Sequence, residues 1–401
     1  MSRQPVRDYS RLAGTAFERA GVAGLSAMVV GAGALGNEVL KCLALMGAGE
    51  IVIVDRDRIE RSNLTRSVLY CSPDIDAEIE AGTPKAEYAA RRVSEINPDV
   101  RARSLVGEIA DVGLGVLRRV DVVFGCLDNE MARVELGWAC LRANRVLVDG
   151  GLGNLNPSSG MVLVFPGQDG PCPLCRKSAD RRRALLWEMQ GREDPCWMKE
   201  QGQADAGVVP TTPVMASMVG ALQVELGVRA VVQPSAEREL GRAYRVQVHP
   251  GQALEVRAFD RSPSCPLHDP GTFLQEIEER RDRRSASWSV SDLLRETGAS
   301  SLQLDWPLTA AATCRGCGAS WAPLMRRARF RQTRCPSCGG HDLVETDVVS
   351  DVAAGSPLAS RPLAELGLPA AHVHDLVCER EGGVTHRFIE VTGDLTEGAP
   401  C

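Results

Sequence analysis

A glycine-rich turn near the amino terminus of the chain has the spacing of a phosphate-binding loop. Gly31, Gly33 and Gly36 follow the short apolar run 25–30 in a G-x-G-x-x-G pattern. Such a turn lets a phosphate approach the bare backbone at the amino terminus of the following helix. Asp55 ends the next apolar run, where a carboxylate can bind a ribose hydroxyl. This pattern indicates a nucleotide, but dehydrogenases share it, so it does not identify the nucleotide.

Lys85 and Asp128 are charged residues that a nucleotide phosphate could reach. Thr83 is a candidate N-cap and Pro84 a candidate first helical residue, which would place Lys85 at a helix amino terminus. The helix dipole and the ammonium group would both attract an anion there, although a lone lysine is commonly just a solvated surface group. Asp128 follows the apolar run 120–127, at the strand end where open parallel sheets bind ligands. It could equally cap the next helix.

Two cysteine pairs near the carboxyl terminus have the spacing of a zinc ribbon. Cys314 and Cys317 form one C-x-x-C pair, and Cys335 and Cys338 form another after seventeen intervening residues. Four thiolates at this spacing predict a structural zinc site, whereas a redox function would require two unrelated dithiols. The intervening strip 325–334 is basic, as in some ribbons that bind nucleic acid. Because the whole chain is acidic, we expect a solvated edge on a structural or protein-docking ribbon instead.

The elements that must position these residues alternate between strands and helices. A helix is expected from Leu35 to Met46, because apolar residues recur at helical spacing before Gly47. A second helix from Lys85 should end at Asn97, which precedes a proline. Strands are expected at 25–30, 51–54, 100–106, 120–127, 145–149, 159–165, 373–377 and 385–391, with a short helix at 289–298. This order predicts an α/β fold, a doubly wound Rossmann-like sheet with a small C-terminal zinc-ribbon domain.

The composition narrows the class of protein. Lys and Arg total 46 against 52 acidic residues in 401, a net charge of -6, which does not favour binding to polyanions. The polar segment 1–9 argues against a signal peptide, and Lys41 and Glu50 interrupt the most apolar region, so no membrane span is expected. Without an export signal, the 14 cysteines are better explained as metal ligands and thiols than as disulfides. We therefore expect a cytoplasmic protein.

Longer motifs around these residues carry a family resemblance. Asp55 to Arg66 read D-R-D-R-I-E-R-S-N-L-T-R, and Asp128 to Arg133 read D-N-E-M-A-R. The first resembles the D-x-D-x-[VI]-x-x-S-N-L-x-R signature of the ThiF/MoeB/HesA family and of ubiquitin-activating enzymes, and the second resembles the family's D-N-x-x-A-R motif. Ordered motifs of this kind cover roughly the first 270 residues. Ser67 departs from the pattern, because the family usually has Gln there.

The resemblance implies ATP, magnesium and a homodimer. Magnesium would bridge Asp128 to the ATP phosphates, and Arg66 and Lys85 would stabilise the developing charge. Arg11 lies in an opening, D-Y-S-R, similar to the family's R-Y-x-R, and would reach the nucleotide of a partner subunit; by itself it would be a solvated surface arginine. Asn129 and Arg133 would support the Asp128 loop. The full set of nucleotide-binding residues implied in this way is Gly31, Gly33, Gly36, Asp55, Asp57, Asn63, Arg66, Lys85, Asp128, Asn129 and Arg11.

The same resemblance suggests a role for a further cysteine pair. Cys172 and Cys175 could be a redox dithiol or half of a zinc site, and their spacing does not decide. The family often has a second C-x-x-C pair about ninety residues later, where this chain has Cys265 and His268. Three thiolates and one imidazole would complete a tetrahedral zinc site. His268 stands where a cysteine is usual, and an ordinary solvent-facing histidine is the alternative.

Cys196 is the candidate nucleophile. It precedes the run 210–217, P-T-T-P-V-M-A-S, which resembles the helix after the family's catalytic loop. In thioester-forming members the nucleophilic cysteine lies on the loop before such a helix. Helix ends or cations could lower the pKa of this thiol, as a nucleophile requires. Cys196 lies upstream of the position that sulfur-carrier enzymes use, so the alternative is a free cysteine in an enzyme that stops at the adenylate.

Together these features predict ATP-dependent adenylation of the C-terminal carboxylate of a ubiquitin-like or sulfur-carrier protein, followed by a thioester on Cys196. An adenylate-only sulfur-carrier or peptide adenylyltransferase is one alternative, and a zinc-ribbon adaptor with a regulatory nucleotide site is another. A nicotinamide-dependent oxidoreductase would leave Arg66, Lys85 and Asp128 without a role. The expected partners are a small β-grasp protein and a conjugating enzyme or sulfur donor, and neither a membrane nor nucleic acid is expected.

The expected domain organisation has three parts. They are an adenylation domain at 1–270, a linker or helical segment at 271–310, and a zinc ribbon with a β-rich tail at 311–401. Within the middle part, residues 276–284 are dense in alternating charge, which is typical of a solvated helix or linker.

Overall fold

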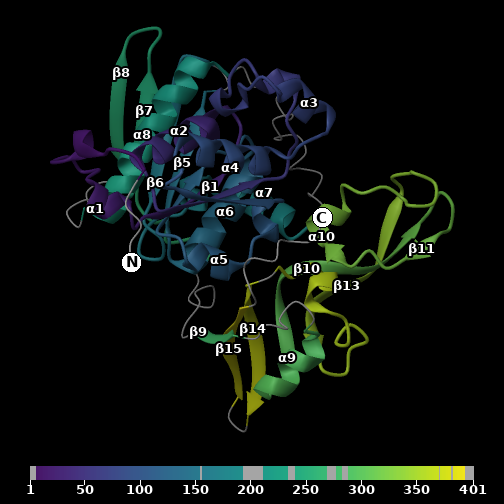
Figure 1. Cartoon of the computed structure of the whole chain (residues 1–401). Coiled ribbons are helices and arrows are strands. Elements are labelled where there is room, and N and C mark those ends of the chain that lie inside the picture. The colour runs from purple at the N-terminus through teal and green to yellow at the C-terminus, as the bar shows by residue number, and fades with distance from the viewer. Residues whose placement is uncertain are drawn as a thin grey trace. The chain divides into compact units, whose positions relative to one another are not determined.

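The structure is a computed structural model, and it describes residues 6–153, 156–192, 211–233, 240–268, 277–281, 288–369, 371–380 and 383–392 (Figure 1). The chain forms two compact units. The first comprises Met1–Val112, Leu117–Lys177 and Asp205–Phe273, and the second comprises Gly113–Val116, Ser178–Ala204 and Leu274–Cys401.

An eight-stranded sheet forms the centre of the first unit, in the order β3-β2-β1-β4-β5-β6-β7-β8. The strands are β1 (Ser26–Val30), β2 (Glu50–Asp55), β3 (Arg101–Val106), β4 (Val122–Gly125), β5 (Val146–Leu152), β6 (Ser159–Phe165), β7 (Arg242–Gln247) and β8 (Ala253–Ala258). The first five strands pair in parallel, and β5 to β8 pair antiparallel. Because β2 and β4 flank β1, the winding reverses at β1, and sheets of this kind bind ligands beyond the carboxyl ends of the strands there. The predicted doubly wound α/β fold is confirmed.

Helices connect these strands. They are α1 (Arg19–Val22), α2 (Ala34–Met46), α3 (Ile75–Glu80), α4 (Lys85–Ile96), α5 (Leu114–Arg118), α6 (Glu130–Ala143) and α8 (Pro213–Val232). Short 3₁₀ helices lie at Ser10–Leu12, Arg61–Asn63, Val68–Tyr70, Ile109–Asp111, Pro173–Arg176 and Pro266–His268.

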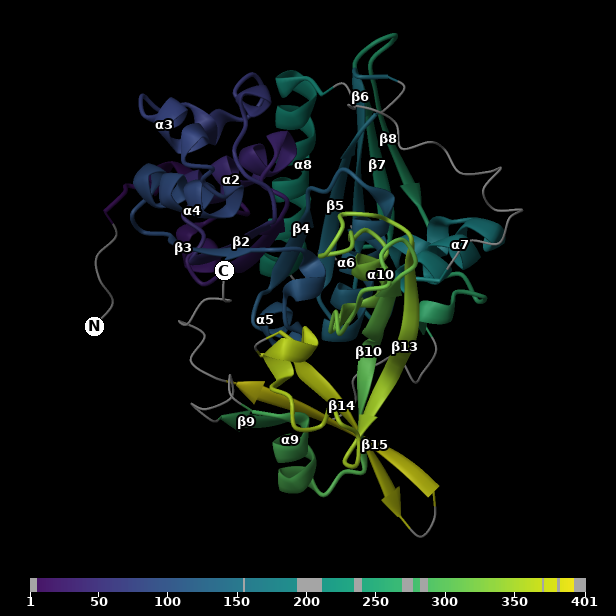
Figure 2. The same ribbon diagram turned by 90° about the vertical axis from the view of Figure 1, so that its right-hand side faces the viewer.

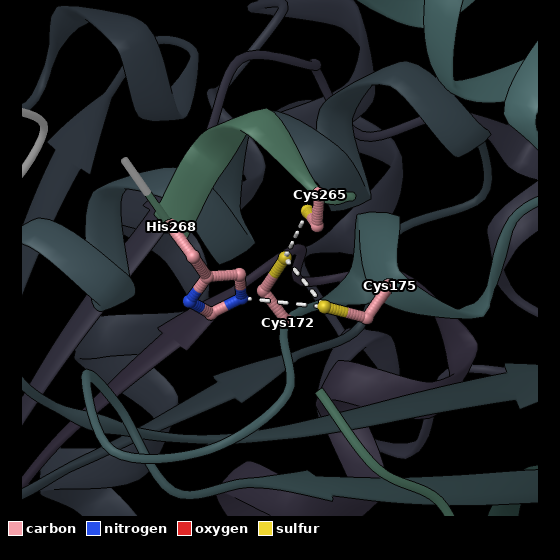
Figure 3. Close-up of side chains that lie close together, drawn as sticks. All are labelled: Cys172, Cys175, Cys265 and His268. Atoms are coloured by element: carbon pink, nitrogen blue, oxygen red, sulfur yellow. Dashed lines mark hydrogen bonds between the residues drawn. The ribbon is translucent and has the colours of Figure 1, made fainter. Parts of the chain in front are cut away.

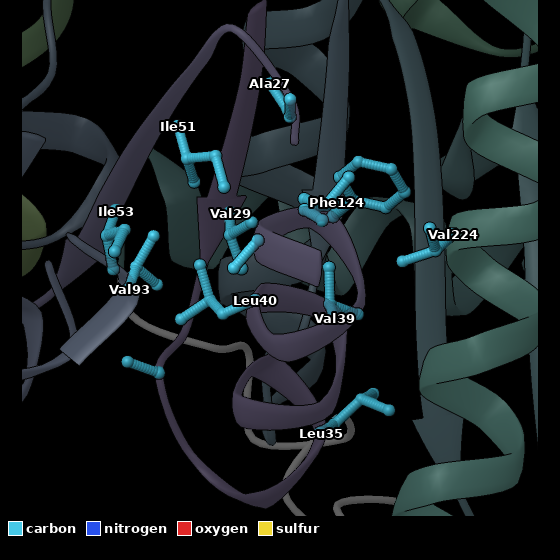
Figure 4. Packing of buried hydrophobic residues seen from close by; sticks show 14 of the residues in the cluster. Ala27, Val29, Leu35, Val39, Leu40, Ile51, Ile53, Val93, Phe124 and Val224 are labelled. Atoms are coloured by element: carbon cyan, nitrogen blue, oxygen red, sulfur yellow. The ribbon is translucent and has the colours of Figure 1, made fainter. Parts of the chain in front are cut away.

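The helix α2 packs its apolar face on the sheet at the point where the winding reverses. Leu35, Val39 and Leu40 recur at helical spacing and are buried, and Figure 4 shows Val39 and Leu40 near Val29 of β1. The helix ends at Gly47, which adopts a left-handed conformation with φ 75°. The predicted helix and its end are therefore confirmed. Its amino terminus, the end that attracts anions, follows the glycine-rich turn.

The helix α8 is long and apolar enough to cross a membrane by length and composition, the one such helix in the described part of the chain. Here its apolar residues serve the core instead, because Met215, Val219 and Val224 are buried in the same cluster as the sheet residues. Gln223 is also fully buried, and its amide donates to the carbonyls of Gly125 and Val148 at 3.0 and 2.9 Å. Packing against the sheet therefore explains the apolar character of α8.

The second unit is built on a seven-stranded sheet. Its strands are β9 (Ile277–Arg281), β10 (Ser301–Cys314), β11 (Ser320–Trp321), β12 (Met325–Arg326), β13 (Leu343–Ala353), β14 (Val373–Arg380) and β15 (Gly383–Thr392), and its helices are α7 (Ala179–Met189), α9 (Val290–Thr297) and α10 (Arg327–Phe330). Figure 2 shows β10 and β13 as a long antiparallel pair. Leu293 of α9 packs with Leu302, Leu376 and Ile389 in a small apolar core. The strands expected near 373–377 and 385–391 and the helix at 289–298 are confirmed.

The helix or linker expected over 276–284 is wrong for Ile277–Arg281. This segment forms the edge strand β9, parallel to β15. Its alternating charges are compatible with a strand because backbone hydrogen bonds hold the pair, and Glu278 accepts from the Arg387 guanidinium of β15 at 2.8 and 3.0 Å. The strand β10 also crosses the expected boundary between residues 310 and 311, since it runs from Ser301 to Cys314.

We expect Leu40→Ala to lower the free energy of unfolding by about 2–5 kcal/mol, since it removes a fully buried side chain from the contact between α2 and the sheet. Leu45→Ala on the same helix is the matched control, because Leu45 is 58% exposed. Urea unfolding followed by far-ultraviolet circular dichroism measures both. Equal losses in the two variants would contradict the packing described.

Candidate functional site

The glycine-rich turn lies at the carboxyl end of β1 and depends on close backbone packing. Gly31 has φ +97°, and a Cβ there would lie 2.5 Å from the Cys126 carbonyl oxygen. A Cβ on Gly36 would overlap the carbonyl oxygen of Gly31. Both positions therefore require glycine. Around Gly33, by contrast, a Cβ would meet no described atom within 4 Å, so this is the open side from which a phosphate could approach.

Asp55 joins the glycine turn to the charged loop after β2. Its Oδ2 accepts from the Ala32 amide at 2.6 Å, and its Oδ1 accepts from the Asp57 amide at 2.7 Å. Burial raises the pKa of Asp55, while these two hydrogen bonds and Lys85 oppose that rise. Each carboxylate oxygen can still accept a second hydrogen bond, so the ribose contact stays a prediction.

Lys85 lies at the amino terminus of α4 and contacts Asp57. Its Nζ is 2.9 Å from Asp57 Oδ2, with 11% of the lysine side chain and 55% of the aspartate side chain exposed. The predicted N-cap Thr83 is wrong by one residue. Pro84 is the N-cap, because it is extended in an isolated bridge to Arg58, and the Thr83 hydroxyl donates to Glu78 instead.

Asn63 and Arg66 lie on the loop after Asp57. Asn63 is buried, and its Oδ1 accepts from the Glu60 amide at 2.9 Å, so the side chain folds the loop itself. Its role as a nucleotide contact stays a prediction. Arg66 is half-buried, and no described residue forms a hydrogen bond or ion pair with its guanidinium. Arg66 is therefore a cation that is available to a ligand.

Asp128 is exposed immediately after the loop that follows β4. The helix cap considered for it is wrong: Asn129 is the N-cap of α6, and its side chain accepts from the Ala132 amide at 2.7 Å. This leaves the Asp128 carboxylate with a long contact of 3.4 Å from the Asn129 amide among the hydrogen bonds of the described residues. An exposed carboxylate near the candidate phosphate turn would suit magnesium, which binds through one or two carboxylates and substrate phosphates.

Two residues that hold the site, Asp149 and Asn37, were missed in the sequence analysis. Arg133, which the family resemblance implied as a support of the Asp128 loop, donates to Asp149 Oδ2 at 2.6 Å and to the Leu127 carbonyl, and it thereby fixes the turn before Asp128. Burial raises the pKa of Asp149, and Arg133 opposes the rise. Asn37, on the buried face of α2, donates to the Ala32 carbonyl at 2.7 Å. A polar residue among apolar helix positions was the available signal for Asn37, but the Arg133–Asp149 pair joins residues far apart in sequence.

The amino-terminal arm is fixed at the opposite end of α2. The Tyr9 hydroxyl donates to Asp99 at 2.9 Å and accepts from Asn97, and Tyr9 lies against Gly47 at the carboxyl end of α2. Because α2 has 13 residues, that end is about 20 Å from the glycine turn. Arg11 is exposed two residues after Tyr9, and two residues span at most about 7 Å.

Three cysteines and His268 converge as predicted (Figure 3). Cys172 Sγ lies 3.8 Å from Cys175 Sγ and 3.7 Å from Cys265 Sγ, and Cys175 Sγ lies 3.3 Å from His268 Nε2. A tetrahedral zinc ion with Zn–S bonds of about 2.3 Å would place its sulfur ligands about 3.8 Å apart. Burial lowers the pKa of His268, which favours the neutral imidazole that binds metal. The donor set fits zinc.

The zinc ribbon is also assembled. Cys314 and Cys338 are 3.7 Å apart, as are Cys317 and Cys335. Each C-x-x-C pair lies in a tight turn that a glycine amide closes. The Gly318 amide donates to the Cys314 carbonyl, and the Gly339 amide donates to the Cys335 carbonyl, both at 2.8 Å. Cys317 and Cys338 are exposed, and the other two cysteines are buried.

Arginines of the basic strip between the ribbon cysteines form contacts within the second unit. Arg327 binds Glu345, and Arg326 lies over the Trp306 ring at 4.8 Å. These contacts favour the structural interpretation of the strip over nucleic-acid binding.

Cys196, the candidate nucleophile, lies outside the described residues.

Comparison with known proteins shows which protein family the chain matches. The sequence profile of the ThiF family matches residues 14–267. The SAMP-activating enzyme E1 of Haloferax volcanii is 37% identical over 155 residues, 37% of this chain and 52% of that protein. The sulfur carrier protein ThiS adenylyltransferase of Escherichia coli is 28% identical over 244 residues, 60% of this chain and 84% of the relative. The crystal structure of E. coli MccB with succinimide, 20% identical, covers 63% of this chain and 68% of its own, with a TM-score of 0.48. The chain thus spans about half the length of the first of these relatives.

We expect the purified chain to contain two zinc ions, one for each cysteine cluster. Cys265→Ser and Cys338→Ser should each reduce the content to about one, because each variant removes a ligand from one cluster. Elemental analysis after desalting measures the content, and Cys71→Ser, which changes an exposed cysteine outside both clusters, is the control. A content that stays at two in either ligand variant would contradict the assignment.

Proposed function

Because the chain belongs to the ThiF family, we propose that it uses ATP to adenylate the C-terminal carboxylate of a ubiquitin-like or sulfur-carrier protein in the cytoplasm. One observation carries the proposal. The glycine turn, the Lys85–Asp57 pair and the exposed Asp128 follow β1, β2 and β4, which are neighbours in the sheet. Relatives named for adenylation and for activation of small modifier proteins support the same chemistry.

In the proposed reaction, an oxygen of the substrate carboxylate attacks the α-phosphorus of ATP. A bond forms between this oxygen and phosphorus, and the bond to the departing pyrophosphate breaks. The carboxylate is ionised at neutral pH, so no general base is required. Negative charge grows on the phosphate oxygens, and Arg66 and Lys85 would stabilise it. Asp57 holds the Lys85 ammonium in place beforehand, which reduces the cost of orienting it.

Magnesium would be held by Asp128. The exposed carboxylate and the absence of a strong hydrogen bond to it among the described residues fit a hard cation that is shared with phosphate oxygens. When bound, the ion would neutralise charge on the leaving pyrophosphate. Arg133 and Asp149 would keep the Asp128 turn in position.

The homodimer is part of the proposal because the family resemblance implies that Arg11 reaches the nucleotide of a partner subunit. The Tyr9 ring is anchored at the carboxyl end of α2, about 20 Å from the glycine turn of the same subunit, which favours that arrangement. We propose a division into an adenylation domain at 1–270, a linking segment at 271–310 and a ribbon with its tail at 311–401, in which α7 packs with the ribbon and β10 joins the last two parts.

A thioester on Cys196 is the proposed next step, in which its thiolate attacks the acyl carbon and AMP leaves. A chain that stops at the adenylate, with no covalent adduct, is the alternative. A conjugating enzyme or a sulfur donor would then accept the acyl group.

Asp128→Ala should reduce ATP–pyrophosphate exchange about 100-fold or more, because it removes the group that holds magnesium at the phosphates. The assay uses the ubiquitin-like or sulfur-carrier proteins encoded by the same genome as substrates. Glu95→Ala, which changes an exposed carboxylate near the far end of α4, is the control and should leave exchange unchanged. Wild-type exchange in Asp128→Ala would contradict the proposed reaction.

Mixing two inactive variants tests the homodimer. Arg11→Ala and Lys85→Ala should each be inactive alone, whereas a heterodimer would contain one intact site, with Lys85 from one subunit and Arg11 from the other. After denaturation and refolding together at equal amounts, exchange should recover to about a quarter of the wild-type value, since half of the dimers would each have one of two sites intact. The outcome that would rule out action in trans is no recovery in refolded mixtures whose subunits are shown to exchange.

A further inference from the structure

The carboxyl-terminal end of α7 lies against the zinc ribbon within the second unit. Gly191 follows α7 in a left-handed conformation, φ +63°, and its amide donates to the Glu188 carbonyl at 2.9 Å. A Cβ on Gly191 would lie 2.6 Å from the backbone nitrogen of Ala328 in α10. Arg331 donates from its Nε to the Gly191 carbonyl. Close backbone approach and a charged donor therefore hold this helix end to the ribbon.

The donor is itself held by the ribbon strands. Glu345 of β13 accepts from Arg327 at 2.7 and 2.8 Å, and its carboxylate lies 3.5 Å from Arg331. The Thr309 hydroxyl of β10 donates to the same carboxylate at 2.8 Å. Glu345 is thus fixed by neighbours on two elements, and it orients the two arginines of α10.

A metal would also hold α10 in this position. α10 lies within the loop that joins Cys317 to Cys335, and a zinc ion on the cluster would hold the two ends of that loop together, in addition to the pairing of β11 and β12 with β10. The buried Phe330 packs near Trp321, with ring centroids 6.3 Å apart. This is a small apolar contact for the whole loop between Cys317 and Cys335. Small domains of this kind obtain much of their folding free energy from the metal.

We propose that the zinc-loaded ribbon anchors the carboxyl-terminal end of α7, and that Gly191 and Arg331 are the positioning residues of this anchor. The consequence for catalysis rests on the proposed function. Cys196, the proposed nucleophile, follows Gly191 by five residues in the sequence. The ribbon would then serve the acyl transfer that follows adenylation rather than adenylation itself.

Hydrogen–deuterium exchange of the full chain tests the anchor directly. In Arg331→Ala, amides in the peptide covering 179–192 should exchange about tenfold faster, the effect of losing one charge-assisted hydrogen bond. Arg334→Ala is the matched control, since Arg334 is an exposed member of the same basic strip. Cys338→Ser, with the loss of one zinc ion confirmed, should reproduce the effect of Arg331→Ala.

A glycine pair separates the contact from backbone strain. Gly191→Ala should also accelerate exchange in 179–192, because its Cβ would displace α10. Gly298→Ala has the same left-handed strain, with φ +69°, but no described atom within 4 Å of the added carbon, and it should leave 179–192 unchanged. Unchanged exchange in Arg331→Ala, or in Cys338→Ser after zinc loss, overturns the anchor.

Activity measurements distinguish this inference from the proposed function. In Arg331→Ala, and in Cys338→Ser after zinc loss, ATP–pyrophosphate exchange should persist. The amount of substrate protein bound to the chain as a thioester should fall about tenfold. An equal fall in exchange and thioester would overturn the assignment of the ribbon to the later step. If the wild-type chain shows no pyrophosphate exchange, the proposed function fails, and the deuterium result alone decides the anchor.

Discussion

The hydrogen bond from the Ala32 amide to the Asp55 carboxylate is the interaction on which the candidate nucleotide site depends. It joins the turn after β1 to the end of β2. The second oxygen of Asp55 holds the Asp57 amide, and Asp57 in turn holds the Lys85 ammonium. A single half-buried carboxylate therefore connects the phosphate turn, the charged loop and the amino terminus of α4. Burial raises the pKa of Asp55, and the converging amides and Lys85 oppose that rise.

Elements with a periodic pattern were predictable from the sequence, since periodicity and turn chemistry act locally. The helix α2 ends at Gly47 because the residue there must be left-handed, and the strands of the parallel sheet are short apolar runs. The four ribbon cysteines were also predictable, because a tetrahedral site constrains cysteine spacing. The grouping of Cys172 and Cys175 with Cys265 and His268 came from the family resemblance, and the structure places His268 Nε2 3.3 Å from Cys175 Sγ.

What the sequence did not reveal depends on contacts between distant residues. The Arg133–Asp149 pair forms because β4 and β5 are neighbours in the sheet, which no local pattern encodes. The strand β9 has the composition of a solvated segment, and only the edge offered by β15 makes it a strand. The helix caps at Pro84 and Asn129 were each displaced by one residue, since competing side chains and an isolated bridge decide among neighbouring candidates.

The two metal clusters differ in a way that follows from their surroundings. In the first cluster Cys172, Cys265 and His268 are buried, and the ion would join two segments about ninety residues apart. The ribbon cluster has two exposed cysteines and only a small apolar contact beside it. With 4% aromatic residues in the whole chain, a region of this size has little apolar area with which to hold its loops. We therefore expect the position of α10, and with it the hold on Gly191, to depend on the metal as well as on the pairing of β12 with β10, whereas the sheet that carries Asp55 has a core of its own.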